Sequence, residues 1–288
     1  MDEVRTGWGL AVLSAAGFGT LAIFGELAGA RGMSIQTLLA FRFSLAVPLV
    51  WGFLAWQGRL RRLDGGNLAI AVALGALGYA GMSGLFLWGV ARTTAGLGSI
   101  LLYTYPVFVV ALAVAFLDER LTWRRTVALV LALTGVVLVS GAQPRGVDPL
   151  GVVVLLLSAA IYAAYITVSG VVLEAVDAPT LSAHVIPAAG AAFVAVGAVT
   201  GTLALPRTPG EWAITGAVAL FSTAIPIVSF YAAIRRIGAS RTSIVSTVEP
   251  VFTVALGVLV LEERLTVLTL LGGAVVLTGV ALVQAEPA

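Results

Sequence analysis

An internal repeat constrains the fold of this chain more than any other feature. Residues 106–108 recur as 250–252, 119–122 recur as 263–266, and 134–136 recur as 278–280. The offset is always 144 residues, half of the 288-residue chain. When 92–139 is compared with 236–283 without gaps, 22 of 48 positions are identical. The chain therefore contains two copies of one unit, and its fold has to be built from that unit twice.

The composition places both copies in a membrane. Hydrophobic residues make up 60% of the chain, charged residues 10%, and the mean hydropathy is +1.07, whereas soluble domains carry about 25% charged residues. There is no cysteine and only one histidine, so we expect no metal site and no cofactor. The net charge is +2 and the arginines are scattered, which argues against a nucleic-acid partner.

Ten apolar runs have the length that a bilayer requires of a helix, roughly 20 residues. They lie near 7–28, 34–57, 67–90, 94–117, 121–141, 150–172, 179–204, 211–234, 239–261 and 265–284. The polar breaks between them are too short for a soluble domain. The sequence therefore predicts an all-α membrane protein, with an uncleaved first helix.

The ten spans divide into two repeats of five, residues 1–143 and residues 144–288. Because five is odd, the second repeat must be inverted relative to the first. Placing both termini in the cytoplasm puts ten arginines inside and five outside, as the positive-inside rule favours. Arg124 and Arg125 would lie inside, whereas their repeat mates, Leu268 and Thr269, would lie outside without charge. This supports the inverted arrangement with both termini cytoplasmic.

These repeated signatures resemble the drug/metabolite transporter superfamily and its EamA-type domains. The residues that carry the resemblance are 41–43 (Phe-Arg-Phe), 105–108 (Tyr-Pro-Val-Phe) followed by 118–122, and 249–252 (Glu-Pro-Val-Phe) followed by 262–266. The second copy departs from the pattern, because Ala-His-Val at 183–185 stands where the first copy has its arginine. Among members, the chain is most similar to bacterial aromatic amino-acid exporters.

The resemblance implies a multi-pass protein of the bacterial inner membrane. It also implies that helices 1–4 and 6–9 surround a central cavity, with helices 5 and 10 outside it. The partners so implied are an amino-acid substrate and membrane lipid.

Two prolines and one acid are candidates for the transport machinery. Pro106 and Pro250 are repeat mates near the middle of their spans, where each removes a helix hydrogen bond. They favour a gating or site-shaping kink over a static one. Glu249 is the acidic residue clearly inside a span, and intramembrane charges indicate function by default. It could bind a substrate ammonium or carry a coupled proton, or it could pair with an arginine or a helix end.

Arg42 lies about two turns into the second span. It could attract a substrate carboxylate, or it could snorkel or tie its helix to backbone carbonyls; the family pattern favours the structural role. His184 is more typical of a satisfied interior histidine than of a proton relay.

Aromatic and hydroxyl side chains complete the expected substrate site. Tyr79, Met82 and Phe86 share one face of the third span, and an aromatic cavity suits a large apolar side chain. The full set of candidate substrate-binding residues is Tyr79, Met82, Phe86, Tyr103, Tyr105, Tyr162, Ser243, Ser246 and Glu249.

The sequence thus predicts a secondary transporter that exports aromatic or large neutral amino acids by alternating access. A multidrug or other small-metabolite exporter is the alternative within the superfamily. A membrane sensor or enzyme is the alternative from another class, but no catalytic residue can be assigned. Gly272, Gly273 and Gly279 in the last span fit a dimer face or internal packing equally well; we expect a monomer.

Overall fold

The computed structural model describes residues 2–63, 65–93, 95–140, 148–262 and 266–285. Every regular element in these ranges is a helix. Nine of these helices are long and apolar enough to cross a membrane, and α7 (Trp123–Ser140) is a further helix of 18 residues. The expected all-α fold of ten spans is therefore confirmed. Because each half supplies five spans, the second half starts from the side opposite to the first.

The first half contains five spans, of which two are interrupted. These are α1 (Asp2–Gly29), α2 (Ile35–Trp56), the third span with α3 (Gly65–Ala73), η1 (Leu74–Tyr79) and α4 (Ala80–Val90), the fourth span with α5 (Ala95–Leu102) and α6 (Tyr105–Phe116), and α7.

The second half repeats the arrangement. Its spans are α8 (Pro149–Ala175), α9 (Ala178–Val199), the eighth span with α10 (Pro209–Ala219), η2 (Leu220–Ala224) and α11 (Ile225–Ile237), the ninth span with α12 (Ala239–Ser246) and α13 (Glu249–Leu261), and α14 (Val267–Gln284).

Side-chain caps fix where many spans begin. The first-turn amides of α2, α8, α9, α10 and α14 donate to the side chains of Ser34, Asp148, Asp177, Thr208 and Thr266. These amides have no partner inside the helix, so the caps satisfy them before the chain enters lipid.

The predicted end of the seventh span was wrong by five residues. The seventh span was expected to reach residue 204, but α9 ends at Val199. Gly201 adopts a φ of +67°, and the next amide, that of Thr202, donates to the carbonyl of Gly197 at 2.9 Å. This Schellman turn ends the helix although the sequence stays apolar.

The two halves interlock through their first helices. Helix α1 packs against α11, α12 and α13 of the second half, and α8 packs against α4, α5 and α6 of the first half. Helices α2 and α9 pair with each other, as do α7 and α14. Neither half is therefore an independent bundle, and the molecular centre is built from both.

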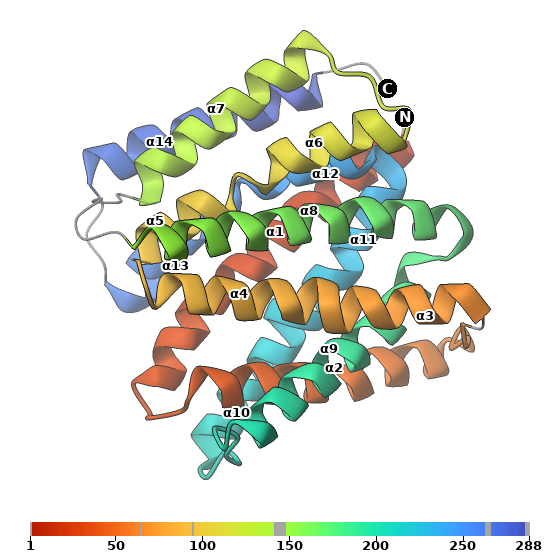
Figure 1. Ribbon diagram of the computed structural model, residues 1–288, viewed down its shortest axis with the longest axis vertical. Helices are drawn as coiled ribbons and strands as arrows, with labels where there is room; N and C mark the ends of the chain where they lie inside the picture. Colours follow the sequence, from red (N-terminus) through yellow and green to blue (C-terminus); the bar gives the residue numbers. More distant parts are fainter. Residues whose placement is uncertain (1, 64, 94, 141–147, 263–265, 286–288) are drawn as a thin grey trace.

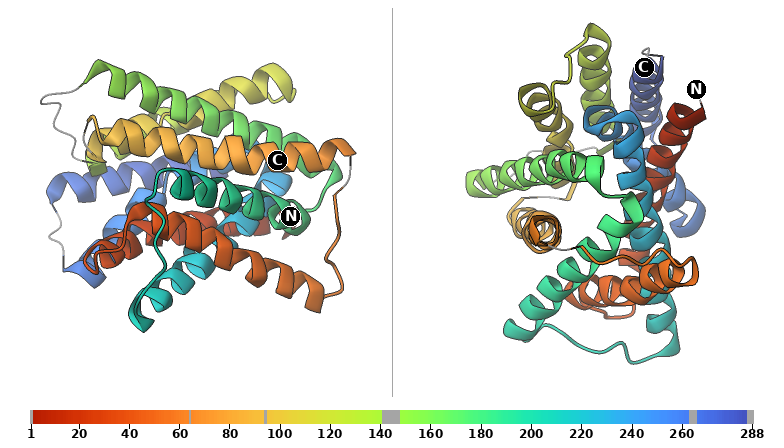
Figure 2. Two further views of the ribbon diagram at one scale, coloured as in Figure 1. Left: turned by 60° about the horizontal axis from the view of Figure 1, so that its bottom comes forward. Right: turned by 90° about the vertical axis from the view of Figure 1, so that its right-hand side faces the viewer.

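Helices α7 and α14 lie side by side at one edge of the molecule, opposite α2, α9 and α10 (Figures 1 and 2). Glycines bring the two axes close together: a Cβ on Gly272 would lie 2.8 Å from the carbonyl oxygen of Gly135, and one on Gly279 would lie 2.8 Å from that of Ala128. Of the two uses expected for these glycines, the structure shows internal packing for Gly272 and Gly279.

The start of α1 and the end of α14 lie at the same end of the bundle (Figure 1). The assignment of this end to the cytoplasm remains a prediction from the arginine distribution.

Candidate functional site

Four spans are interrupted, at positions that the repeat relates. Segments η1 and η2 are π-helical turns within the third and eighth spans. The fourth and ninth spans break at residues 103–104 and 247–248, which are 144 residues apart. Such π turns and half-helices concentrate at functional sites, because they release backbone groups from the regular hydrogen-bond ladder.

The predicted prolines lie directly after the two breaks. Pro106 and Pro250 fall in the first turn of α6 and α13, where the missing proline N–H leaves no intrahelical bond unmade. Within the first break, the Thr104 hydroxyl donates to the carbonyl of Leu101 at 2.6 Å. The expected kinks are therefore present as full interruptions. Their role in gating remains a proposal.

All six tyrosines of the sequence meet in one cluster. It consists of Tyr79, Tyr103, Tyr105, Tyr162, Tyr165 and Tyr231, which come from the third, fourth, sixth and eighth spans. Each ring contacts another member, with centroids 4.7 to 6.2 Å apart. All are buried except Tyr162, which keeps some exposed surface. This tyrosine cluster joins the two halves at the centre of the protein.

Hydroxyl groups hold the cluster to its neighbours. The hydroxyls of Tyr165 and Tyr231 lie 2.6 Å apart and form a hydrogen bond. The Tyr105 hydroxyl donates to the carbonyl of Ser243 on α12 at 3.3 Å. The cluster is thus both an aromatic surface and a set of oriented hydroxyls.

Arg42 lies at one end of the tyrosine cluster and is only 1% exposed. Its Nη2 donates to the Tyr79 hydroxyl at 3.0 Å and to the carbonyl of Ser222 at 3.4 Å. The guanidinium also lies 4.7 Å from the centroid of the Phe43 ring. Its Nε has no hydrogen-bond partner within the described residues. Arg42 therefore ties its helix to a backbone carbonyl, which is one of the roles expected for it. Its Nε remains an unpaired donor within the described residues.

Glu249 lies directly after the break in the ninth span. It is the first residue of α13, where the amides of a helix N-terminus stabilise negative charge. Helix α1 approaches closely here, because a Cβ on Gly19 would lie 3.2 Å from the Glu249 carbonyl oxygen. Glu249 remains partly exposed.

The other candidates lie around the cluster with differing roles. The hydroxyls of Ser243 and Ser246 donate to carbonyls of their own helix, at 2.8 and 2.9 Å, and the Ser243 carbonyl accepts from Tyr105. Met82 is buried, and its carbonyl accepts a 2.9 Å bond from Ser158. Phe86 has no ring contact among the described aromatic residues and packs towards α5.

Sequence reasoning missed two residues at this site. Tyr231 is fully buried and bonds Tyr165, and Ser222 supplies the carbonyl that Arg42 uses. Tyr231 was detectable as the sixth tyrosine in an otherwise tyrosine-poor chain. Ser222 had no such signal, because a backbone carbonyl is available only where the π turn η2 forms.

His184 is a satisfied interior histidine, the first of its two expected roles. Its Nδ1 lies 2.9 Å from the carbonyl of Thr180, and its Nε2 accepts the amide of Leu63 at 3.2 Å. Both ring nitrogens are therefore engaged, Nδ1 within α9 and Nε2 in holding the link between α2 and α3 against α9.

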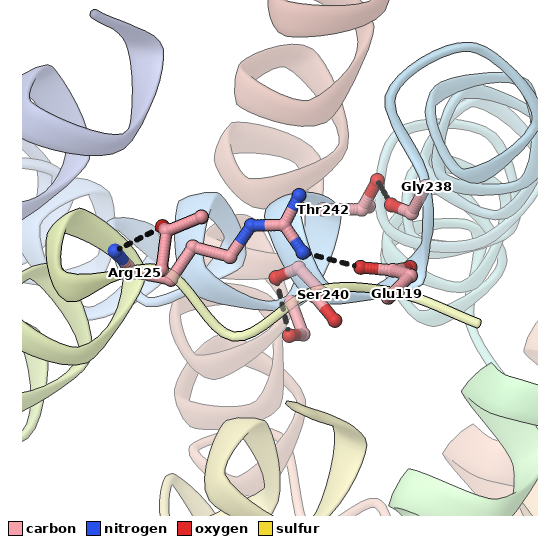
Figure 3. A network of polar contacts seen from close by, with 7 residues as sticks. Glu119, Arg125, Gly238, Ser240 and Thr242 are labelled. Atoms are coloured by element: carbon pink, nitrogen blue, oxygen red, sulfur yellow. Dashed lines mark hydrogen bonds and ion pairs between the residues drawn. The ribbon is translucent and has the colours of Figure 1, made fainter. Parts of the chain in front are cut away.

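Polar contacts cluster around Glu119, Arg125 and the start of α12 (Figure 3), at the end of the bundle where α1 begins (Figure 1). Arg125 donates to Glu119 at 2.7 Å, with side chains 11% and 17% exposed. A Cβ on Gly238 would lie 3.1 Å from the Glu119 carboxylate, which therefore lies at the start of α12. Residues 119 and 125 belong to the first half and α12 to the second, so this network joins the two halves. The repeat mate of Glu119, Glu263, lies outside the described residues.

The same end carries a charged surface depression of about 480 Å³. Its lining includes Arg59, Arg235 and Arg236 together with Glu3 and Asp177. These arginines are among those that the positive-inside rule assigned to one side.

A model of the EamA-like transporter family matches the chain twice, at residues 5–141 and 149–285. This confirms the resemblance identified from the repeated signatures.

Similar proteins are transporters by description. An uncharacterized transporter of Bacillus subtilis (strain 168), YcbK, is 31% identical over 270 residues, covering 88% of this chain and 85% of the relative. An uncharacterized transporter of Archaeoglobus fulgidus is 26% identical over 264 residues, covering 88% and 90%. A probable terminal-alkyne amino-acid exporter of Streptantibioticus cattleyicolor is 32% identical over 119 residues, covering 41% and 38%.

A solved crystal structure of a protein aligns with this fold at a TM-score of 0.84, covering 96% of both chains. The sequence identity is 17%, so this likeness supports the fold alone.

Proposed function

The chain belongs to the EamA-like transporter family, and we propose that it exports aromatic or large neutral amino acids by alternating access. The bacterial inner membrane is the proposed location, with both termini cytoplasmic. The two repeats, residues 1–143 and 144–288, are the proposed moving units. Family membership favours this function over a membrane sensor or an enzyme.

The tyrosine cluster is the observation that carries the substrate class. Six aromatic rings pack together where the two halves meet, several of their hydroxyls are held by hydrogen bonds, and the charged Arg42 bonds one of them. Aromatic faces bind large apolar side chains well, while hydroxyls and charges orient polar groups. A large neutral amino acid combines both features. The partial likeness to an amino-acid exporter points the same way.

The interruptions support alternating access. A carrier of this kind needs a central site and helices that bend around it. The breaks before Pro106 and Pro250 and the π turns η1 and η2 lie beside the tyrosine cluster. They are placed by the repeat symmetry, so each half contributes one of each kind. We assign the two prolines to the hinges of this motion.

The carboxylate of Glu249 and the tyrosine cluster also favour a second candidate, a multidrug exporter of organic cations, because aromatic rings and a carboxylate suit such ligands. The buried charge of Arg42 beside the tyrosine cluster opposes a ligand that is only cationic.

Counterflow in proteoliposomes would test the proposed function. Purified protein is reconstituted, the vesicles are loaded with one unlabelled amino acid, and uptake of the labelled amino acid is measured with and without a pH gradient. We expect saturable counterflow of phenylalanine, tyrosine or leucine. Absence of flux for every amino acid, in vesicles shown to contain folded protein, would refute the proposal. Flux of organic cations alone would favour the multidrug exporter.

A further inference from the structure

We propose that the charged depression at the end of the bundle where α1 begins binds the headgroup phosphate of an anionic phospholipid, held by Arg59, Arg235 and Arg236. The inference does not depend on which substrate the protein carries. It assigns a ligand to a surface that neither the tyrosine cluster nor the interrupted spans use.

The depression lies between helix ends that come from both halves of the chain. It has a volume of about 480 Å³, and its lining residues are Glu3 and Arg59 from the first half and 177–179, Ala232, Arg235 and Arg236 from the second. Arg59 follows the end of α2, whereas Arg235 and Arg236 belong to the last turn of α11. A ligand bound here would therefore contact both halves at once.

The three arginines keep most of their donors for a ligand. All three residues are exposed, and none forms an ion pair with a described residue. Arg236 donates from Nη1 to the carbonyl of Ala232 at 2.9 Å, while Arg59 and Arg235 make no side-chain hydrogen bond within the described residues. Guanidinium groups stay charged and match phosphate oxygens in bidentate geometry. The arrangement therefore suits a phosphate.

Two carboxylates also line the depression, but neither forms an ion pair with these arginines. Asp177 caps α9: its Oδ1 accepts from the amide of Thr180 at 3.0 Å, and its Oδ2 accepts from the Thr180 hydroxyl at 2.9 Å. Glu3 is exposed in the first turn of α1. Three cations against two carboxylates leave the depression net positive, and one of the carboxylates is already engaged by the start of α9.

The rim of the depression continues into the lipid-facing surface. Trp56, the last residue of α2, is 82% exposed, and Phe53 beside it is 53% exposed, with ring centroids 6.2 Å apart. Exposed aromatic residues at the end of a span lie at the level of the lipid headgroups. Arg59 follows Trp56 by three residues, so the depression lies near the depth of the headgroup phosphates. Basic pockets between spans at this depth bind anionic lipid headgroups, which favours a lipid over a soluble anion.

The repeat shows that the fold does not require an arginine at position 59. The turns that end α2 and α9 have the same geometry, because the amides of Arg59 and Thr202 each donate to the carbonyl five residues earlier, at 2.8 and 2.9 Å. Gly58 and Gly201 precede them with φ of +63° and +67°. Thr202 thus occupies the equivalent position in the second half, and the helix ends equally well without the charge.

The repeat mate of Arg236 is an arginine with its own partners. This residue, Arg92, lies 3.9 Å from a carboxylate oxygen of Asp148, and its guanidinium lies 3.4 Å from the centroid of the Trp88 ring. The inverted copy therefore satisfies its arginine within the protein, whereas the arginines of the depression have no such counterion. This asymmetry favours an anion site at the end where α1 begins.

Lipid binding to detergent-purified protein tests the site. Native mass spectrometry measures binding of dioleoylphosphatidylglycerol, which is anionic, and of dioleoylphosphatidylcholine, which has the same acyl chains and no net charge. We expect wild-type protein to bind phosphatidylglycerol at least about tenfold more tightly, because each arginine near an anionic lipid contributes roughly fivefold in affinity. Phosphatidylglycerol should also raise the Tm more than phosphatidylcholine, since a ligand that joins the two halves stabilises the folded protein.

Paired variants locate the binding. Arg59→Gln combined with Arg235→Gln should weaken phosphatidylglycerol binding by about 30-fold, from the same roughly fivefold contribution of each arginine. Arg61→Gln combined with Arg62→Gln is the matched control, because it removes the same charge from exposed residues that follow Arg59 but do not line the depression. The control pair should keep nearly the wild-type affinity. Arg59→Lys combined with Arg235→Lys keeps both charges and should bind more tightly than the glutamine pair.

The outcomes decide between this site and simpler explanations. Equal weakening by the two glutamine pairs would overturn it, since the whole basic end would then attract the lipid. Equal affinity of the wild-type protein for the two lipids would overturn it as well. Glycerol 3-phosphate is the soluble probe, and competition at concentrations comparable to those of phosphatidylglycerol would show a site for a soluble anion instead of a lipid. None of these measurements requires transport, so failure of the lipid site leaves the proposed function untouched.

Discussion

Replacing Gly75 with alanine should lower stability more than the small size of the change suggests. Gly75 lies in η1 and faces α9 at close range. A Cβ at this position would lie 2.4 Å from the carbonyl oxygen of Val185, 2.7 Å from Cβ of Ala188 and 2.9 Å from the amide of Ala189. Two of these three atoms belong to the α9 backbone, which cannot rotate away as a flexible side chain can. The methyl group must therefore push η1 and α9 apart.

The magnitude follows from two opposing effects. Overpacking a well-packed interior costs about 1–3 kcal/mol, and backbone contacts this short place Gly75→Ala at the upper end. Alanine gains up to about 1 kcal/mol over glycine in helix propensity. The expected net loss is about 2 kcal/mol, or an apparent Tm about 4 °C lower on the scaling for large domains. The displacement should also disturb Tyr79, the last residue of η1, and weaken substrate binding.

Gly81→Ala is the matched control. Gly81 lies six residues further along the same span, and a Cβ there would meet no atom within 4 Å. Both variants are compared with wild type by thermal unfolding of detergent-purified protein and by substrate binding. Gly81→Ala should melt at or slightly above the wild-type temperature. The packing argument fails if Gly75→Ala melts no lower than Gly81→Ala.

Three further predictions concern the tyrosine cluster, the packing of α7 against α14, and the ion pair at the end of the bundle where α1 begins. Tyr165→Phe removes the 2.6 Å bond to Tyr231 and should cost about 1–2 kcal/mol, read as a lower Tm; an unchanged Tm would show that this bond contributes nothing. Gly272→Ala would place a Cβ 2.8 Å from a backbone oxygen of α7, whereas Gly273→Ala meets only side-chain atoms at 3.8 Å; only the first should lower the Tm, and equal effects would contradict the internal packing. Glu119→Gln breaks the ion pair with Arg125 at the end of the bundle where α1 begins. It should raise the rate at which a thiol reagent labels a single cysteine introduced at that end, where the native chain has no cysteine to interfere. An unchanged labelling rate would show that the ion pair does not restrict access there.

Much of the architecture was predictable because lipid imposes simple rules on sequence. Apolar runs located the spans, since a bilayer core requires a fixed length of helix. The repeated prolines located the breaks in the fourth and ninth spans, because proline cannot complete the helical ladder. The charge of Glu249 singled it out, because charges are rare within spans.

The π turns and the pairing of helices were not predictable in this way. The glycine-rich stretch before Tyr79 is equally compatible with a regular helix, and hydropathy does not distinguish α from π geometry. The exchange of α1 and α8 between the halves depends on how the surfaces fit. For the same reason the partner of Arg42 in η2, a carbonyl made available by local backbone geometry, could not be read from residue types.

Arg42 links equivalent elements of the two repeats, although the second repeat has no matching arginine. Its Nη2 bonds Tyr79 at the end of η1 and the Ser222 carbonyl in η2, so one guanidinium spans the corresponding π turns of the two halves. Any motion that separates these turns must break at least one of the two bonds. The bond to Ser222, at 3.4 Å, is near the limit for a hydrogen bond and is the weaker one. A carboxylate bound by Arg42 would compete with this contact first, and we expect it to loosen η2 while leaving η1 attached. Ligand binding would then favour one arrangement of the halves over the other, because the ligand interacts differently with each.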